Sequence, residues 1–223
     1  MIYFLGDLHG DWMALHHHED KFNKDDIIIQ VGDFGFYPTI MPDLDILFPN
    51  GYPCTVYVID GNHEDFNFLG ERVNGNELWE FHPNMFYVPR GTVMEINGYL
   101  IGFLGGAESV DVAWRTEGYS WWPEERVTEA DVQKLIDNVN DRQLDVLVTH
   151  APPPPIIKTN WPLIDRAYWQ LPLGWEDISS QQVQVSIDVL NPHKVVCGHM
   201  HRSVVRDNVR ILDINEFRDM ERL

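Results

Sequence analysis

Several apolar segments of the chain end abruptly on side chains that commonly bind metal ions. In residues 2–12, IYFLGDLHGDW, a run of apolar residues leads into Asp7 and His9, and burying either without a partner is costly. The same ending recurs in four further segments: IIIQVGDFG, TVYVIDGNHED, LDVLVTH and KVVCGHMH. The polar residues at the five ends are Asp7, His9, Asp33, Asn62, His63, His150, His199 and His201.

These residues are expected to lie close together in the folded chain. In an open α/β sheet, ligand sites form beyond the carboxyl ends of the strands, so side chains distant in sequence meet in one crevice. Carboxylate, amide oxygen and imidazole, without thiolate, suit manganese, iron, zinc, cobalt or nickel better than calcium or an iron–sulfur cluster. Seven such ligands are too many for one ion and suit two that share a carboxylate: Asp7, His9, Asp33, Asn62, His150, His199 and His201.

The segments around these residues predict an α/β fold. Short apolar strands at IYFLG, DIIIQVG and CTVYVID alternate with helical stretches, which is typical of an α/β sheet. From residue 85 onward, strands joined by glycine-containing turns appear, including the Asn97-Gly98 hairpin signal. Residues 129–141 have apolar residues at helical spacing, and residues 144–150 are typical of a buried strand. We expect one domain spanning residues 1–223.

The order of the motifs resembles that of the calcineurin-like metallophosphoesterases. That family carries D-x-H, G-D, G-N-H-D/E, a lone histidine after a strand, and G-H-x-H. This chain has GDLHG, GDFG, GNHED, VTH and GHMH in the same order. The resemblance implies two β-sheets packed as a sandwich and flanked by helices. It also implies one metal ion held by Asp7, His9, Asp33 and His201, and a second held by Asp33, Asn62, His150 and His199.

The implied activity is hydrolysis of a small phosphoester, with a phosphodiester such as a nucleotide favoured over a monoester. Two divalent or trivalent ions, manganese by preference, would activate a bridging hydroxide for in-line attack and clamp the attacking and leaving oxygens. Asn62 would supply a ligand without adding charge. His63 would act as the catalytic histidine, stabilising the transition state or protonating the leaving group.

Two other functions remain as alternatives. A phosphomonoesterase or a nuclease would use the same metal chemistry at the same residues. A non-catalytic scaffold would keep the fold and use its surface for protein partners, as some members of the family do. The retention of His63 and of every ligand argues against the scaffold.

One motif departs from the pattern of related enzymes. Protein phosphatases of this superfamily have G-D-x-x-D-R, in which the second Asp orients the catalytic histidine and the Arg binds phosphate. Here the motif is GDFGFY, with Phe36 and Tyr37 at those positions, which disfavours a protein phosphatase. Glu64 and Asp65 are candidates to orient His63 only because they are close in sequence.

Phosphate binding by arginine has three candidates. Arg115 and Arg166 lie in segments without clear periodicity, and Arg202 directly follows His201. We expect Arg202, and after it Arg115, to contact the substrate, although most arginines lie on the surface without such a role.

The charge of the chain limits its partners. Acidic residues outnumber basic ones by 35 to 16, for a formal net charge of −19, and there is no basic run. This repels nucleic acid and anionic membrane surfaces, so a small anionic substrate would need a local positive site. Without a signal peptide or an apolar run long enough to span a bilayer, a cytoplasmic location is expected. Cys54 and Cys197 are predicted to be buried free thiols.

Two segments without clear periodicity, residues 107–125 and 151–176, contain six of the eight tryptophans. Long irregular segments in compact domains are usually functional, and dense aromatic residues argue against disorder. The tryptophans stack on a substrate base, pack the cap of the site or form a dimer contact, and a structural role is favoured because aromatic residues bury the most area. As a hypothesis, replacing Trp121 and Trp122 with alanine should change substrate preference.

Overall fold

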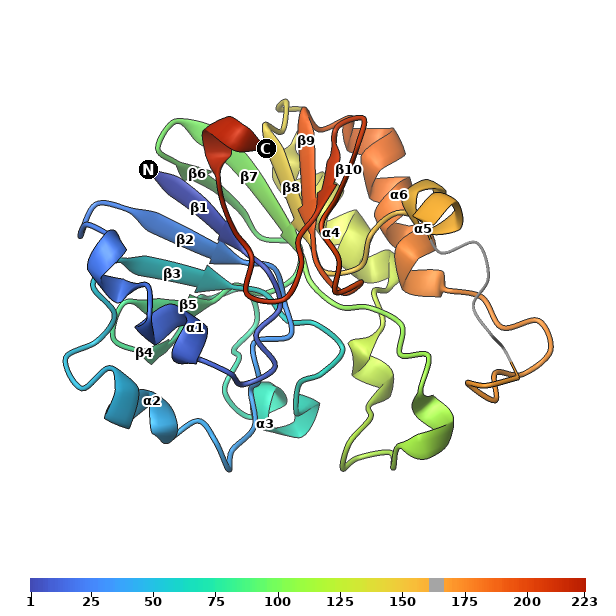
Figure 1. The fold of residues 1–223 in the computed structure, drawn as a ribbon. Helices are drawn as coiled ribbons and strands as arrows, with labels where there is room; N and C mark the ends of the chain where they lie inside the picture. Colours follow the sequence, from blue (N-terminus) through green and yellow to red (C-terminus); the bar gives the residue numbers. More distant parts are fainter. Residues whose placement is uncertain (161–166) are drawn as a thin grey trace.

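The structure is a computed structural model that describes residues 1–160 and 167–223. Within these residues, two six-stranded sheets pack face to face, and helices cover both outer faces (Figure 1). The predicted α/β sandwich flanked by helices is therefore confirmed. The described chain contains no helix that is both long and apolar enough to cross a membrane.

The first sheet carries the three N-terminal motifs. Its strands in spatial order are β12 (Phe217–Asp219), β1 (Ile2–Leu5), β2 (Ile27–Gln30), β3 (Thr55–Val58), β5 (Met85–Tyr87) and β4 (Trp79–His82). The four inner strands are parallel, and β12 and β4 pair antiparallel at the edges. Parallel pairing brings the carboxyl ends of β1, β2 and β3 to the same edge of the sheet.

The second sheet carries the two C-terminal motifs. Its strands in spatial order are β10 (Val204–Arg206), β11 (Val209–Ile211), β9 (Lys194–Cys197), β8 (Val146–Thr149), β7 (Tyr99–Leu104) and β6 (Val93–Ile96). The four inner strands are again parallel between antiparallel edges. Asn97 and Gly98, with φ of 50° and 82°, form the two-residue turn between β6 and β7, as their sequence predicted.

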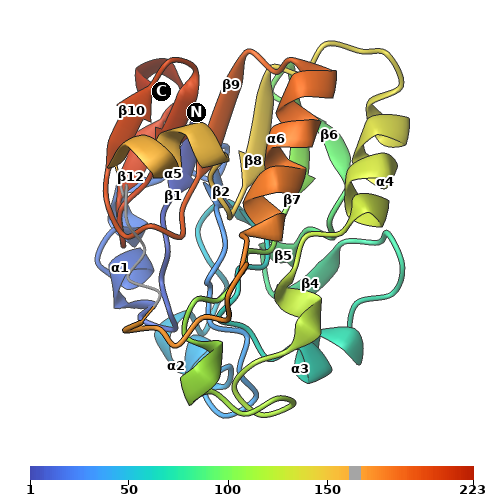
Figure 2. The same ribbon diagram turned by 90° about the vertical axis from the view of Figure 1, so that its right-hand side faces the viewer.

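The helices form the two outer layers. They are α1 (Met13–His16), α2 (Asp43–Leu47), α3 (Phe66–Gly70), α4 (Glu129–Val139), α5 (Pro154–Asn160) and α6 (Ile178–Leu190). Figure 1 shows α1, α2 and α3 outside the first sheet, and Figure 2 shows α4 and α6 covering the second. The irregular segments also contain short 3-10 helices at Val112–Trp114 and Pro123–Glu125. Trp161 and Arg166 lie outside the described residues.

Three apolar layers hold these elements together. On β2, Ile28 faces the layer under α1–α3, whereas the next residue, Ile29, faces the layer between the two sheets. Because the inner strands are covered on both faces, their sequences are continuous apolar runs rather than alternating ones. Each fully buried isoleucine, leucine or valine contributes about 1.5–3 kcal/mol to folding. Cys54 and Cys197 are buried and free, as predicted.

A buried ion pair connects the end of β3 to the irregular segment 107–125. The carboxylate of Asp60 is fully buried, and it accepts hydrogen bonds from Arg90 Nε at 2.8 Å and from the Tyr87 hydroxyl at 3.0 Å. Arg90 also donates to the main-chain oxygens of residues 124–126. The guanidinium therefore neutralises an acid near the site and fixes the segment that covers it.

We expect Arg90→Ala to lower the free energy of unfolding by about 3–5 kcal/mol, because it leaves the Asp60 charge buried without a partner. Urea unfolding monitored by circular dichroism measures this change. The matched control is Arg222→Ala, which removes an arginine whose side chain is 78% exposed and paired with Asp219. The control should cost less than about 1 kcal/mol. Equal effects of the two substitutions would contradict the structural role of Arg90.

Candidate metal centre

The ends of β1, β2 and β9 bring four of the predicted ligands into one cluster. Asp7, His9, Asp33 and His201 each offer a ligand atom, and these atoms lie within 4.8 Å of one another. His201 Nε2 is 3.3 Å from Asp7 Oδ2, and His9 Nε2 is 3.5 Å from Asp33 Oδ2. The two histidine nitrogens are 2.9 Å apart. Both carboxylates are fully buried, whereas the histidines reach the surface.

Asp33 also faces the remaining predicted ligands. His150 Nε2 lies 3.2 Å from Asp33 Oδ2 and 3.2 Å from Asn62 Oδ1, and the His199 ring is 5.1 Å from the His150 ring between centroids. His150 Nδ1 is 2.8 Å from the Val31 carbonyl oxygen. Because a carbonyl can only accept a hydrogen bond, Nδ1 carries a proton and Nε2 is the atom available to a metal.

The two oxygens of Asp33 have different surroundings. Oδ1 accepts a hydrogen bond from the main-chain nitrogen of His63 at 2.8 Å. Oδ2 is buried and accepts no hydrogen bond, although the Nε2 atoms of His9 and His150 lie 3.5 and 3.2 Å from it. A buried oxygen without a hydrogen bond is exceptional, and a cation shared by these groups would satisfy it. The donor set therefore fits a metal pair that shares Asp33.

Backbone conformation also sets these residues apart. His9, Asp33, His199 and His201 have φ of 50°, 56°, 69° and 48°, in the left-handed region that costs roughly 1–2 kcal/mol for a residue with a side chain. In the described chain, every histidine with positive φ belongs to this set. Such strain persists where the surrounding structure imposes it, and it is concentrated at functional sites.

Metal binding requires neutral imidazole, and the surroundings shift the pKa values of the histidines in both directions. The hydrogen bond with Asp7 raises the pKa of His201. Burial lowers the pKa of His199 to about 3, and the charge of His150 adds to this shift. Burial also lowers the pKa of His9. Burial lowers the pKa of His150 as well, but the charge of Asp33 outweighs it and raises the pKa to about 10. A proton and a metal ion therefore compete for Nε2 of His150.

Two glycines allow the main chain to approach the carboxylates. A Cβ atom at Gly61 would overlap Oδ1 and the main-chain nitrogen of Asp33, and one at Gly198 would overlap Oδ1 of Asp7. Glycine is the residue without the atom that would collide. The glycines of GNHE and GHMH thus have a steric role beside the ligands.

Glu64 and Asp65 do not orient His63, in contrast to the expectation from their position in the sequence. The buried Glu64 carboxylate accepts hydrogen bonds from the main-chain nitrogens of Phe34, Gly35 and Phe36 at 2.7–3.0 Å. Glu64 therefore fixes the loop after Asp33. Asp65 accepts from the main-chain nitrogen of Phe68 at 2.9 Å and caps α3.

The His63 ring contacts Arg115 and lies 5.0 Å from the His9 ring between centroids. Arg115 Nη2 lies 3.0 Å from Nδ1 and 2.8 Å from Nε2 of His63, and Arg115 Nη1 donates to the Asn62 main-chain oxygen at 3.4 Å. Asp111 accepts from Arg115 Nε at 2.8 Å, and the Arg115 side chain is only 9% exposed. Burial lowers the pKa of His63 to about 4; the charge of Asp33 opposes this shift and that of Arg115 adds to it.

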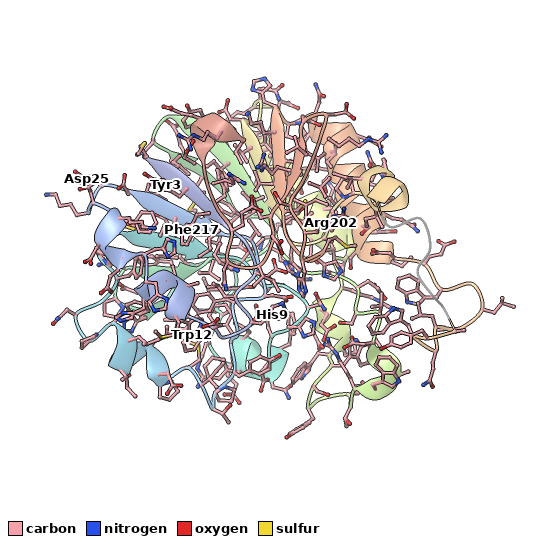
Figure 3. The ribbon with its side chains drawn as sticks, viewed as in Figure 1. Tyr3, His9, Trp12, Asp25, Arg202 and Phe217 are labelled. Carbon is pink, nitrogen blue, oxygen red and sulfur yellow. The ribbon has the colours of Figure 1, made fainter. Side chains whose placement is uncertain are left out.

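The other two arginine candidates differ in position. Arg202 is exposed and follows His201, and Figure 3 labels it together with His9 near the centre of the view. Arg166 lies outside the described residues. Of the three arginines, Arg115 is the one for which the structure shows contacts with the site.

The tryptophans divide into core and surface residues. Trp122 is 4% exposed and Trp121 is half-buried, and the effect of replacing them on substrate preference stays a prediction. Trp114 is 50% exposed, and its ring lies 5.2 Å from that of Tyr168 and 5.0 Å from that of Trp169. These three residues, called the loop aromatic cluster, include the residue just before Arg115.

The sequence did not reveal two buried residues near Asn62: Ser109, which contacts Asn62, and Glu125, which contacts Ser109. Ser109 Oγ accepts a hydrogen bond from Asn62 Nδ2 at 3.0 Å, and the Ser109 hydroxyl donates to Glu125 Oε2. Burial raises the pKa of Glu125 to about 8, against the hydrogen bond from Ser109 and the charge of Arg115. The signal for Ser109 was its place beyond the strand end in FLGGAES, whereas nothing near Glu125 marks it.

Comparisons with known proteins agree with this fold. The family model described as calcineurin-like phosphoesterase matches residues 1–203. None of the curated protein sequences compared with the chain matches it. The crystal structure of TT1561 from Thermus thermophilus is 17% identical with a TM-score of 0.55, over 96% of this chain and 89% of that chain. GAP50, titled the anchor in the inner membrane complex of Plasmodium, is 11% identical with a TM-score of 0.48, over 96% and 72%.

We expect Gly61→Ala to weaken metal binding and to lower the free energy of unfolding by about 1–3 kcal/mol, because the added methyl group displaces Asp33. Calorimetric titration with Mn²⁺ and thermal unfolding measure the two effects. The matched control is Gly70→Ala at the end of α3, where a Cβ atom meets nothing within 4 Å. It should leave metal binding unchanged. Wild-type Mn²⁺ affinity in Gly61→Ala would refute the steric role of Gly61.

Proposed function

Because the chain belongs to the calcineurin-like phosphoesterase family, we propose that it is a metal-dependent hydrolase of a small phosphoester, preferentially a phosphodiester such as a nucleotide. The convergence of oxygen and nitrogen ligands around Asp33 supports this most directly. Its buried Oδ2 atom lacks a hydrogen bond and lies near two imidazole nitrogens. The five motifs that supply these ligands all follow strands of the sandwich.

The proposal assigns the ligands to two ions. One group consists of Asp7, His9, Asp33 and His201, and the other of Asp33, Asn62, His150 and His199. When bound, two divalent cations lower the pKa of water and polarise the phosphoryl group. Manganese is the ion we favour for this mixture of carboxylate, amide and imidazole ligands, and iron, zinc, cobalt and nickel share the same ligand preference.

His63 and Arg115 would contact the phosphoryl group from the protein side. Arg115 Nη2 lies within hydrogen-bond distance of both ring nitrogens of His63, and in the neutral ring one of these nitrogens carries a proton. That N–H can donate to a substrate oxygen. Arg115 contributes a permanent positive charge and holds the imidazole in one orientation. Arg202, which is exposed and follows His201, would contact a part of the substrate that extends toward solvent.

The preference for a nucleotide-like diester rests on the loop aromatic cluster. Aromatic faces bind nucleobases by stacking, and Trp114 exposes half of its surface beside the residue that touches His63. The net charge of −19 opposes a long nucleic acid, which would bring many phosphates near an acidic surface. A small substrate with one or two phosphates meets this repulsion least.

The first test compares bis(p-nitrophenyl) phosphate with p-nitrophenyl phosphate, before and after metal removal. We expect turnover that requires added Mn²⁺, that is faster on the diester, and that falls to the metal-free level in Asp33→Ala, because this substitution removes the shared ligand. The matched control is Asp25→Ala: Asp25 is exposed, and Figure 3 shows it far from His9.

Results that contradict the diesterase proposal distinguish between the two alternatives, a phosphomonoesterase and a non-catalytic scaffold. Faster turnover of the monoester would replace the diesterase proposal with a phosphomonoesterase. No turnover with any of the five metals would contradict an enzyme acting on simple phosphoesters and support a non-catalytic scaffold, which the family also includes.

A second test concerns the loop aromatic cluster. We expect Trp114→Ala to reduce kcat/KM for thymidine 5′-(p-nitrophenyl) phosphate by about 5-fold to 150-fold, the range that loss of base stacking produces. Turnover of methyl p-nitrophenyl phosphate, which has no base, should change little. Tyr119→Ala is the control, since Tyr119 is 81% exposed in the same segment and outside the cluster. A parallel loss on both substrates would refute base stacking at Trp114.

A further inference from the structure

The side-chain amide of Asn62 has a different partner at each end. Its Oδ1 faces His150 Nε2 at 3.2 Å, within the proposed metal ligands. Its Nδ2 points the other way and donates to Ser109 Oγ at 3.0 Å. Rotation of the amide by 180° would exchange the two ends and place an NH₂ group, which cannot bind a cation, where the oxygen now lies. The position of the oxygen therefore depends on what holds the nitrogen.

The Ser109 hydroxyl is itself oriented by Glu125. With Glu125 ionised, the hydrogen of the Ser109 hydroxyl is directed to Glu125 Oε2, so its lone pairs face the Asn62 amide. Both Ser109 and Glu125 are buried, at 3% and 1% exposure, so water does not compete for these contacts. The two hydrogen bonds therefore have the same direction: the Asn62 amide donates to the Ser109 hydroxyl, and the hydroxyl donates to the Glu125 carboxylate. Only the present orientation of the amide satisfies all three groups.

The same carboxylate also supports Arg115. Glu125 Oε1 lies 3.6 Å from Arg115 Nη1 and accepts from the Trp122 main-chain nitrogen at 3.3 Å. The hydroxyl, the main-chain N–H and the guanidinium each present a hydrogen or a positive charge to the carboxylate. Through Arg115, Glu125 is connected to the His63 ring.

We propose that Ser109 and Glu125 are positioning residues of this site: Ser109 fixes the Asn62 amide with its oxygen toward the metal, and Glu125 fixes Ser109 by a hydrogen bond and, together with Asp111, holds Arg115. This inference rests on the proposed function and deepens it. One buried carboxylate from the irregular segment thereby orients a metal ligand and the candidate catalytic histidine. In related protein phosphatases an acid at the position of Phe36 orients the catalytic histidine. In this chain Glu125 orients His63 instead, through Arg115.

The first experiment measures Mn²⁺ binding to the metal-stripped protein by calorimetry. Loss of a group that orients a metal ligand usually weakens affinity by about 10-fold to 100-fold. We expect Ser109→Ala to weaken one of the two Mn²⁺ sites within this range and to leave the other within about twofold of the wild type. Ser109→Thr, which keeps the hydroxyl, should restore the affinity. The control Ser186→Ala removes another buried hydroxyl, one that donates to Gln182 in α6, and should change neither site.

A double-substitution cycle separates amide orientation from general stability. In the Asn62→Asp background both side-chain oxygens are equivalent, so orientation no longer matters. We expect Ser109→Ala to weaken Mn²⁺ binding by less than about twofold in this background, against about tenfold or more in the wild-type background. Equal losses in the two backgrounds, or no loss in either, would overturn the role of Ser109.

Glu125→Gln, measured above pH 8 where Glu125 is ionised, tests the second half of the inference, because it keeps the shape and removes the charge. We expect it to weaken the same Mn²⁺ site as Ser109→Ala and, at saturating Mn²⁺, to lower kcat on bis(p-nitrophenyl) phosphate more than it raises KM, since His63 loses its orientation. Unchanged metal binding and kcat would overturn the role of Glu125. Failure of the proposed function can be distinguished from failure of the positioning role. A wild-type protein that binds two Mn²⁺ ions without hydrolysis refutes the enzyme, and calorimetry alone still tests the positioning role.

Discussion

The buried carboxylate of Asp33 is the group on which the rest of the site depends. The main-chain oxygen of the same residue accepts from the nitrogens of Leu8 and His9 at 3.0 and 2.7 Å, which fixes the loop after β1. Its Oδ1 accepts from the His63 nitrogen, which fixes the loop after β3. Its Oδ2 has no hydrogen bond and faces two imidazoles. One residue thus joins three loops and presents at their centre a buried carboxylate oxygen that faces two imidazole nitrogens.

The clustering of the candidate ligands and the strands that carry them could be predicted because their signals are local. An apolar run that ends on Asp33 or His150 predicts both a strand and the polar residue that follows it, and parallel pairing brings such strand ends together. The role of Phe36 was also partly readable, since an aromatic residue replaced an acid. The structure adds the physical reason: Phe36 packs edge-on against Phe81 at 5.0 Å within the core, where a charge would be buried without a partner.

The contacts that support the ligands could not be predicted, because they join residues far apart without a local pattern. Ser109 lies 47 residues after Asn62, and Glu125 lies 16 residues after Ser109. Glu125 is followed by Arg126 in a polar stretch that is typical of an exposed turn, yet Glu125 is 1% exposed. Its burial depends on Arg90, whose guanidinium binds the main-chain oxygens of residues 124–126. These contacts can be recognised only in the three-dimensional structure.

In the proposed site, the need for such support follows from the use of an amide as a ligand. A carboxylate binds a cation through either oxygen, so rotation about its last bond has no consequence. An amide avoids a further negative charge beside Asp7 and Asp33, which would reduce the ability of bound cations to polarise a substrate. The cost is that only one of its two orientations is correct. A neutral ligand in an already acidic site therefore requires a neighbour that recognises its nitrogen, and in this chain Ser109 is in that position, held in turn by the Glu125 carboxylate.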